Sequence, residues 1–228
     1  MKNNDDFANQ NSELSLANQA YLQIKRGILK LDFPPGGDLT EAFLAEELSM
    51  SRLPISMAVK QLEREGWLVS GYRKKSKVKN VYRQDIIDLF QLREMIELPA
   101  LSRIFETGQN REYSRLIKHG LVDMNEYRED SFLFNETETN LHMTLVKALN
   151  NQKINAIYEQ IRDEVLRVGM MLIKAGNGSR DLFDKVISDW EHLEKALREN
   201  DREEALSVYK SDHLSGSLQL SVKSFETE

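Results

Sequence analysis

The sequence contains no cysteine, so it can form neither disulfide bridges nor metal sites built on thiolates. It also has no run of about 18 apolar residues, so no segment is long enough to span a membrane. The first residues, Met1-Lys2-Asn3-Asn4-Asp5-Asp6, lack a basic region followed by an apolar one, and no secretory signal is predicted. Together these absences lead us to expect a cytoplasmic protein.

Positive charge is also in short supply, because the net charge is −6. Its distribution matters more than the total. Residues 1–82 carry 12 Lys and Arg against 10 Asp and Glu, whereas the remainder carries 19 against 27. Such an asymmetry indicates that the two parts have different tasks. An acidic second part also keeps unspecific attraction to nucleic acid weak, because the basic groups are confined to one region.

The chain divides into four segments by composition and periodicity. Residues 1–15 are polar and predict a disordered tail, 16–80 form a first domain, 81–84 a linker and 85–228 a second domain. Helical spacing of apolar residues covers 16–31, and Phe33-Pro34-Pro35-Gly36-Gly37 interrupts the chain. The second domain shows only helical periodicity, which favours an all-α bundle. Its expected helices are 85–107, 110–127, 131–150, 152–175, 180–199 and 201–224.

Residues 39–80 have the pattern of a winged helix-turn-helix. A short helix opens with Thr40 as its N-cap, Ser49-Met50-Ser51 forms a turn, and a second helix runs from Arg52 to a stop at Gly66. A strand at 67–69 follows, and then 73–79, in which five of seven residues are cationic. This order is typical of a protein that binds duplex DNA. The alternative is a plain helical hairpin followed by a solvated run of charges.

The second helix of this motif separates an apolar stripe from a polar one. Ile55, Val59 and Leu62 are expected in the core, with Arg52, Ser56, Lys60 and Arg64 on another face. Arg52 can reach a phosphate or a guanine edge, and the cations after the strand, including Lys79, add affinity that depends on salt. The candidate DNA contacts are Thr40, Ser51, Arg52, Pro54, Ser56, Lys60, Arg73, Lys74, Lys75 and Lys77.

Several runs resemble the GntR family of bacterial transcription regulators. In the head these are 31–39, 44–48, 51–55 and 58–66. The run 89–97 resembles the entry to the all-helical C-terminal domain of the FadR subgroup, and 140–145 and 193–201 extend the likeness. The resemblance implies a mainly α protein with an N-terminal winged helix-turn-helix and a C-terminal helical bundle that binds an effector.

The head departs from the family pattern at two places. Family members commonly carry a second arginine one turn after the first, used on the operator, where this chain has Ser56. The usual wing glycine is replaced within Lys74-Lys75-Ser76, which makes the wing more cationic. We therefore expect an operator that differs from the family consensus, with more affinity from backbone contacts.

Histidines of the second domain suggest a metal site. Glu138 and His142 are four residues apart and share a helix face, and His192 and His213 lie on the next two long helices. One carboxylate and three imidazoles suit zinc, nickel or manganese. The alternative is that these histidines are ordinary core or surface residues.

The resemblance implies a similar metal site, made by an Asp and three His, with a small carboxylate effector completing the ligands. Here the acidic position holds Glu138. An ungapped alignment puts Trp190 and Asp212 at the last two ligand positions in place of His192 and His213, and a small indel would restore the histidines. Some members of the subgroup lack the metal and bind their effector through polar residues alone.

Three arginines are candidates to bind the carboxylate of an effector. Arg93 belongs to an Arg-x-x-x-Glu pattern with Glu97, and its alternative role is an ion pair with that residue. Arg162 and Arg167 are weaker candidates of the same kind.

Two classes of function fit these features. The first is a DNA-binding regulator, most simply a repressor, that acts as a homodimer on a palindromic operator and responds to a small organic acid. The second is a metal-dependent enzyme with a nucleic-acid-binding appendage. The sequence lacks His-Glu-x-x-His, Gly-x-Ser-x-Gly and a Gly-rich phosphate loop. These absences favour the regulator, which needs no catalytic residues.

Overall fold

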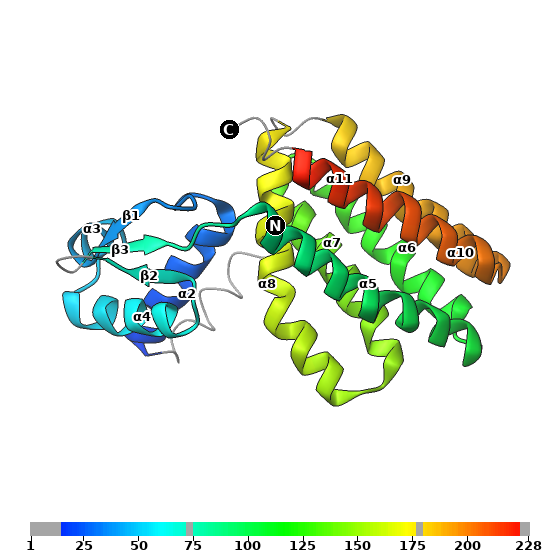
Figure 1. The fold of residues 1–228 in the computed structure, drawn as a ribbon, viewed down its shortest axis with the longest axis horizontal. Coiled ribbons are helices and arrows are strands. Elements are labelled where there is room, and N and C mark those ends of the chain that lie inside the picture. The colour runs from blue at the N-terminus through cyan, green and yellow to red at the C-terminus, as the bar shows by residue number, and fades with distance from the viewer. Residues whose placement is uncertain (1–14, 72–74, 177–179, 224–228) are drawn as a thin grey trace. The chain divides into compact units, whose positions relative to one another are not determined.

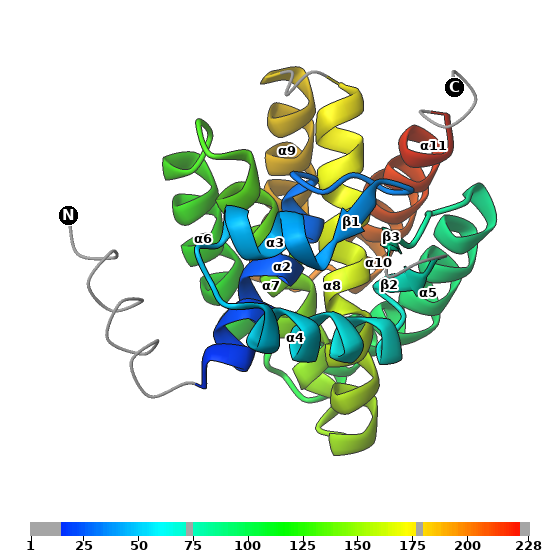
Figure 2. The same ribbon diagram turned by 90° about the vertical axis from the view of Figure 1, so that its left-hand side faces the viewer.

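A computed structural model describes residues 15–71, 75–176 and 180–223. By its internal contacts the chain forms two units, Met1–Val81 and Tyr82–Glu228, and each is described by itself. Figure 1 shows the elements of both units, and Figure 2 gives a second view. The expected disordered tail lies outside the described residues apart from Ser15, whose hydroxyl accepts a bond from the backbone of Asn18 and caps the first helix.

Within its described residues, 15–71 and 75–81, the first unit combines three helices with a small antiparallel sheet. The helices are α2 (Leu16–Lys30), α3 (Glu41–Glu47) and α4 (Arg52–Arg64). The strands are β1 (Asp38–Thr40), β2 (Leu68–Ser70) and β3 (Lys75–Val78), in the order β1-β3-β2. Leu39 pairs with Ser76, and Leu68 with Val78. Strand β1 was not predicted, because three residues between a Pro-Gly break and a helix carry no alternation.

Local signals set the limits of α3 and α4 as the sequence predicts. The Thr40 hydroxyl accepts a hydrogen bond from the Phe43 backbone at 3.1 Å, which confirms it as the N-cap of α3. Gly66 follows the end of α4 with φ +78°, a left-handed conformation that favours glycine. The Trp67 amide then donates to the Leu62 carbonyl at 2.9 Å and closes the helix end. These caps fix where α3 begins and where α4 ends.

The second unit is built from helices alone within the described residues. They are α5 (Arg83–Glu106), α6 (Asn110–Glu126), α7 (Ser131–Val146), η2 (Lys147–Leu149), α8 (Gln152–Ala175), α9 (Arg180–Glu199), α10 (Arg202–Val208), η3 (Tyr209–Ser215) and α11 (Gly216–Lys223). None of the described helices is both long enough and apolar enough to cross a membrane. Residues 83 and 84, assigned to the linker from sequence, lie in the first turn of α5.

The predicted helix over 201–224 is present from Arg202 to Lys223, but its middle is π-helical instead of α-helical. The segment η3 is π-helical, so its hydrogen bonds join residues five apart instead of four. Such turns are rare and are often found at functional sites. Periodicity cannot reveal one, because a π-turn shifts the apolar pattern by only one residue. In this chain the π-helical turn carries both Tyr209 and His213.

Helices α7 and α8 approach closely at Gly169. A Cβ atom added there would lie 2.2 Å from the Asn135 Oδ1, and the Asn135 amide is tied by a 2.6 Å hydrogen bond to the Leu166 carbonyl. We expect Gly169→Ala to lower the free energy of unfolding by about 1–3 kcal/mol, as overpacking typically does. Urea unfolding measures this change. Gly176→Ala is the control, because its Cβ would meet atoms no closer than 3.5 Å. Equal effects would contradict the packing argument.

Candidate functional site

Helix α4 presents the side chains that the sequence assigned to DNA. Ile55 and Leu62 are fully buried, and Val59 is nearly so, as predicted. Arg52, Lys60 and Arg64 are exposed, and Ser56 is half-buried beside them. The helix therefore has one face in the core and an opposite face that carries cations. A free helix N-terminus next to Arg52 adds a partial positive charge to that face.

Strand β3 directs its lysines outward. Lys75 and Lys77 of β3, and Lys79 directly after it, are exposed and alternate with buried Ser76 and Val78. The Lys77 ammonium lies 3.5 Å from the Asp38 carboxylate, and both groups are largely exposed, so this pair is weak. Arg73 and Lys74, two further candidates from the sequence, lie outside the described residues.

Two other candidates have structural tasks. Pro54 is buried in the first turn of α4, so its side chain is turned away from the exposed face. The Thr40 hydroxyl is occupied by the cap of α3. Ser51 is exposed immediately before α4 and makes no side-chain cap to that helix. Leu53 and Met57, which were not among the contacts predicted from sequence, are the large apolar side chains on the exposed face of α4.

The second unit encloses a buried ion pair. The Arg93 Nε donates to the Glu97 Oε1 at 2.9 Å, and both side chains are almost completely buried. The hydroxyls of Tyr158 and Tyr209 also donate to Glu97, the second at 2.7 Å. The alternative role considered for Arg93, an ion pair within its own helix, is therefore present in the structure. The guanidinium also lies over the ring of Phe90, 4.8 Å from its centroid.

Three potential metal ligands converge beside this pair. The His142 Nε2 lies 3.1 Å from the His213 Nε2 and 3.2 Å from the Glu138 Oε1, and the last two atoms are 3.6 Å apart. Ligands about 2.0–2.1 Å from one tetrahedral ion are separated by about 3.3 Å, so the spacing fits a shared metal. Among the described residues, these three form the group whose ligand atoms lie close enough together to hold one metal ion.

The π-helical turn explains which residue of η3 joins the group. His213 is buried next to His142, so the described side chains favour it over the ungapped register, which would place Asp212 there. The side chain of Asp212 is outside the described part of the structure. Trp190 is buried, and its ring centroid lies 5.1 Å from that of His142 and 5.0 Å from that of His213.

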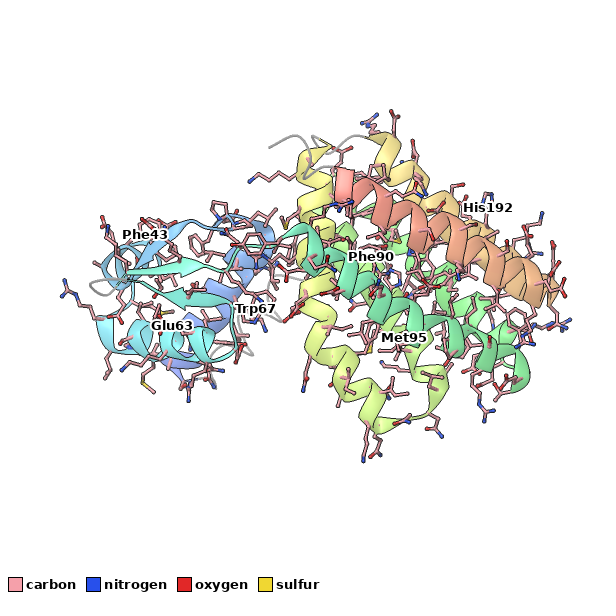
Figure 3. The ribbon with its side chains drawn as sticks, in the orientation of Figure 1. Phe43, Glu63, Trp67, Phe90, Met95 and His192 are labelled. Atoms are coloured by element: carbon pink, nitrogen blue, oxygen red, sulfur yellow. The ribbon has the colours of Figure 1, made fainter. Side chains whose placement is uncertain are left out.

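His192 does not join the cluster. Its side chain is exposed on α9, as Figure 3 shows. Two residues correspond to about 200° around a helix, so His192 points away when Trp190 points inward. The expectation of three clustered imidazoles is therefore corrected to two.

The electrostatics suit metal ligation at two of the three residues, His213 and Glu138. Burial lowers the pKa of His213 to about 3, with a further contribution from His142, so its imidazole is neutral at pH 7. Burial alone would raise the pKa of Glu138, but the hydrogen bond with His142 and the charges of His142, His213 and Arg93 together outweigh it, and the pKa falls to about 2. Burial would also raise the pKa of Glu97, but Arg93 and His142 together outweigh it and hold this pKa well below its ordinary value. At His142 burial and Arg93 lower the pKa, but Glu97 and Glu138 outweigh them and raise it. The cluster thus offers a carboxylate and one neutral imidazole, and His142 must lose its proton before it can ligate an ion.

A cavity of about 40 Å³ adjoins the cluster. Arg93, Asn135 and Glu138 supply its polar wall, and the rest is mainly apolar, including Phe134 and Val165. This volume admits a water molecule but not an organic acid. A ligand of that size requires the surrounding helices to move apart.

The other two candidate arginines do not line this cavity. Arg162 is half-buried and pairs with Glu136 at 3.6 Å and Asp163 at 3.1 Å. Arg167 is buried, and burial lowers its pKa to about 10. Of the three arginines proposed from sequence, Arg93 is the one placed next to the ligand group.

Three residues around the cluster of Glu138, His142 and His213 were not predicted as site residues. Tyr158 and Tyr209 donate to Glu97, and Trp190 was considered only as the residue that an ungapped alignment puts at a ligand position. These residues come from α8, η3 and α9, and their meeting depends on helix packing. One local signal was available, because Tyr209 and His213 are four residues apart, as are Glu138 and His142. A polar aromatic residue at that spacing from a histidine is too common to be informative alone.

Comparison with known proteins gives two matches to families. Residues 16–78 match the family described as bacterial regulatory proteins, gntR family. Residues 88–211 match the FCD domain, and this match alone covers more than half of the chain. The two matched segments fall within the two structural units.

Relatives with both parts are distant but similar over most of their length. The HTH-type transcriptional regulator YdhC of Bacillus subtilis is 21% identical over 85% of this chain and 88% of its own. A fatty acid metabolism regulator protein of Pasteurella multocida is 23% identical over 93% and 92%. The solved structure of E. coli McbR/YncC has a TM-score of 0.71 at 19% identity, covering 93% of this chain and 99% of that chain. At this identity, the similarity to McbR/YncC shows the fold alone.

Proposed function

Because this chain belongs to the gntR family of bacterial regulatory proteins and carries an FCD domain, it is a DNA-binding transcriptional regulator, and we propose that a small organic acid bound in its second unit controls its affinity for an operator. We further propose that it is a repressor and acts as a homodimer on a palindromic operator. The matched families and relatives are transcriptional regulators and not enzymes, so the alternative of a metal-dependent enzyme is not favoured.

Operator binding is proposed to use α4 in the major groove and the lysines of β3 on the backbone. A single recognition helix spans few base pairs, so two copies related by a two-fold axis are needed for a long site. Arg52 is proposed to contact a base or phosphate, and Lys75 and Lys77 to contact phosphates. Exposed side chains at the start of α4 support this arrangement.

The lysines and Arg52 should differ in their effects on DNA binding. We expect replacement of Lys75 and Lys77 by Ala to weaken binding to every duplex and to flatten the slope of log affinity against log salt, by about 0.9 for each phosphate that is no longer neutralised. Arg52→Ala should weaken binding to the operator selectively if it contacts a base. Salt titrations with the operator and a scrambled duplex separate the two. Equal losses on both duplexes would make Arg52 a phosphate contact only.

Effector binding is proposed to occur at the cavity beside Glu138, His142 and His213. The observation that carries this proposal is the convergence of three ligand atoms, 3.1–3.6 Å apart, beside a cavity that Glu138 and Arg93 line. A divalent ion such as zinc, nickel or manganese fits two imidazole nitrogens and a carboxylate oxygen. When bound there, the ion would supply an open coordination position for an effector carboxylate.

The role of Arg93 follows from its contacts. Its Nη2 lies 3.0 Å from the His142 Nε2, the atom that would ligate an ion. If His142 Nε2 gives its lone pair to an ion, it can no longer accept a hydrogen bond from the Arg93 Nη2. Arg93 would then keep its ion pair with Glu97 through Nε, and its Nη2 could donate to an anion in the cavity. We therefore propose that Arg93 pairs with the effector's carboxylate.

Thermal melting tests the site without knowledge of the effector. A ligand that binds only the native state raises the melting midpoint. We propose measuring the midpoint of the metal-free chain, then with zinc, nickel or manganese, and then with a panel of organic acids. His213→Ala should remove the metal-induced rise, whereas His192→Ala, on the exposed side of α9, should keep it. A rise with acids but not with metals would support the alternative in which Arg93 and polar residues bind the effector alone.

A further inference from the structure

The exposed face of α4 carries two large apolar side chains among its cations. Leu53 is 71% exposed and Met57 is 54% exposed, and they are four residues apart. The buried side of the helix, with Ile55, Ala58 and Leu62, lies opposite. Because Leu53 and Met57 contribute to neither the core nor a polar network, their exposure points to a role at a binding surface.

The neighbours of these two residues indicate the kind of partner. Arg52, Lys60 and Arg64 are exposed on the same side of the helix. An apolar protein surface would leave three cations desolvated, whereas DNA offers phosphates to them and apolar groups within the groove. This surface, with cations around a small apolar centre, therefore fits the major groove of DNA better than it fits the surface of another protein.

In the major groove the one apolar group on a base edge is the C5 methyl of thymine. Recognition helices contact bases mainly through their N-terminal residues, and Leu53 and Met57 lie in the first two turns of α4. Ser56, on the adjacent stripe, has a short side chain that leaves room for close approach.

We propose that Leu53 and Met57 recognise thymine methyl groups, so that the operator half-site is specified in part by thymines and not only by hydrogen bonds from Arg52. This inference rests on the proposed operator binding by α4.

Deoxyuridine provides the test, because it lacks only the methyl group of thymidine and pairs identically. An operator is first selected from a random duplex pool with the full chain. Each thymidine of the half-site is then replaced by deoxyuridine in turn, and the affinity is measured at fixed salt. At one or two positions we expect an about fourfold loss, the equivalent of about 0.8 kcal/mol for one buried methyl-sized group.

Variants connect each methyl to its residue. Leu53→Ala and Met57→Ala should each bind the thymidine operator more weakly and lose the difference between thymidine and deoxyuridine at its own position. Both side chains are exposed, so the fold should be retained, and the melting midpoint checks this. The variant with Lys75 and Lys77 replaced by Ala is the matched control, because it should lower affinity for both duplexes by one factor and keep the difference.

The outcomes separate this inference from the proposed function. A specific operator whose affinity is unchanged by deoxyuridine at every position would overturn the inference and leave operator binding intact. An equal loss by the two alanine variants on both duplexes would overturn it as well. Failure to select any duplex would overturn the proposed function of α4 itself.

Discussion

We expect Glu97→Ala to lower the free energy of unfolding by about 3–5 kcal/mol, because it leaves the buried guanidinium of Arg93 without its counter-charge. Both side chains of the pair are almost fully buried, so water cannot replace the missing carboxylate. The hydroxyls of Tyr158 and Tyr209 are deprived of their acceptor at the same time. Urea unfolding of the metal-free chain measures the change, and a loss of this size is a large part of a typical domain's stability.

Two variants test the reason for that loss. Glu94→Ala is made one turn earlier on α5, where the carboxylate pairs with Lys210 at the surface, and should change the stability by at most about 1 kcal/mol. Replacing both charges, Arg93→Met with Glu97→Leu, should destabilise the chain less than Glu97→Ala alone, because no unpaired charge remains. If Glu97→Ala cost no more than Glu94→Ala, the burial of the Arg93 charge would be disproved.

The second large effect concerns regulation. We expect His142→Ala to leave operator binding without effector near normal and to abolish the response to the effector. His142 is the central member of the cluster, within 3.2 Å of both His213 and Glu138. Even an outer residue around a metal site contributes about 10–100-fold to metal affinity, so loss of a ligand should reduce it by at least about 100-fold. Metal titration and operator binding with and without effector measure the two effects.

Reciprocity gives this prediction a second measurement. An effector that weakens operator binding must itself bind more weakly when the operator is present, by the same factor, typically about 5–150-fold. In His142→Ala this factor should approach one. His192→Ala is the matched control and should keep the wild-type factor, since its side chain is exposed away from the cluster. A variant of His142 that fails to fold would identify the residue as a packing residue, and an intact response would remove it from the effector site.

The parts of this fold that could be predicted have local causes. Thr40 and Gly66 act through capping of the backbone beside them, and the four-residue spacing of Glu138 and His142 fixes their shared face. The helices of the second unit follow from apolar periodicity, within a few residues at each end. Binding of metal by the cluster stays a prediction, as do the DNA contacts of Arg52.

What could not be predicted depends on packing between distant segments. Glu97 accepts hydrogen bonds from Tyr158, 61 positions away in the sequence, and from Tyr209, 112 positions away. The π-helical turn of η3 changes the residue that faces His142 by one position, and no amphipathic pattern reports a shift of that size. The exposure of His192 could not be predicted for a similar reason, because the sequence alone does not decide whether His192 or Trp190 faces the bundle interior.

Trp190 gives the cluster an optical signal of its own. The chain has two tryptophans, and the other, Trp67, belongs to the first unit. Indole emission responds to charge and polarity within a few ångströms, and the Trp190 ring is in contact with the rings of His142, His213 and Tyr209. The tryptophan emission of a Trp67→Phe chain would therefore come from the cluster alone. Arrival of nickel, a quencher of indole, would then be followed in real time without a label.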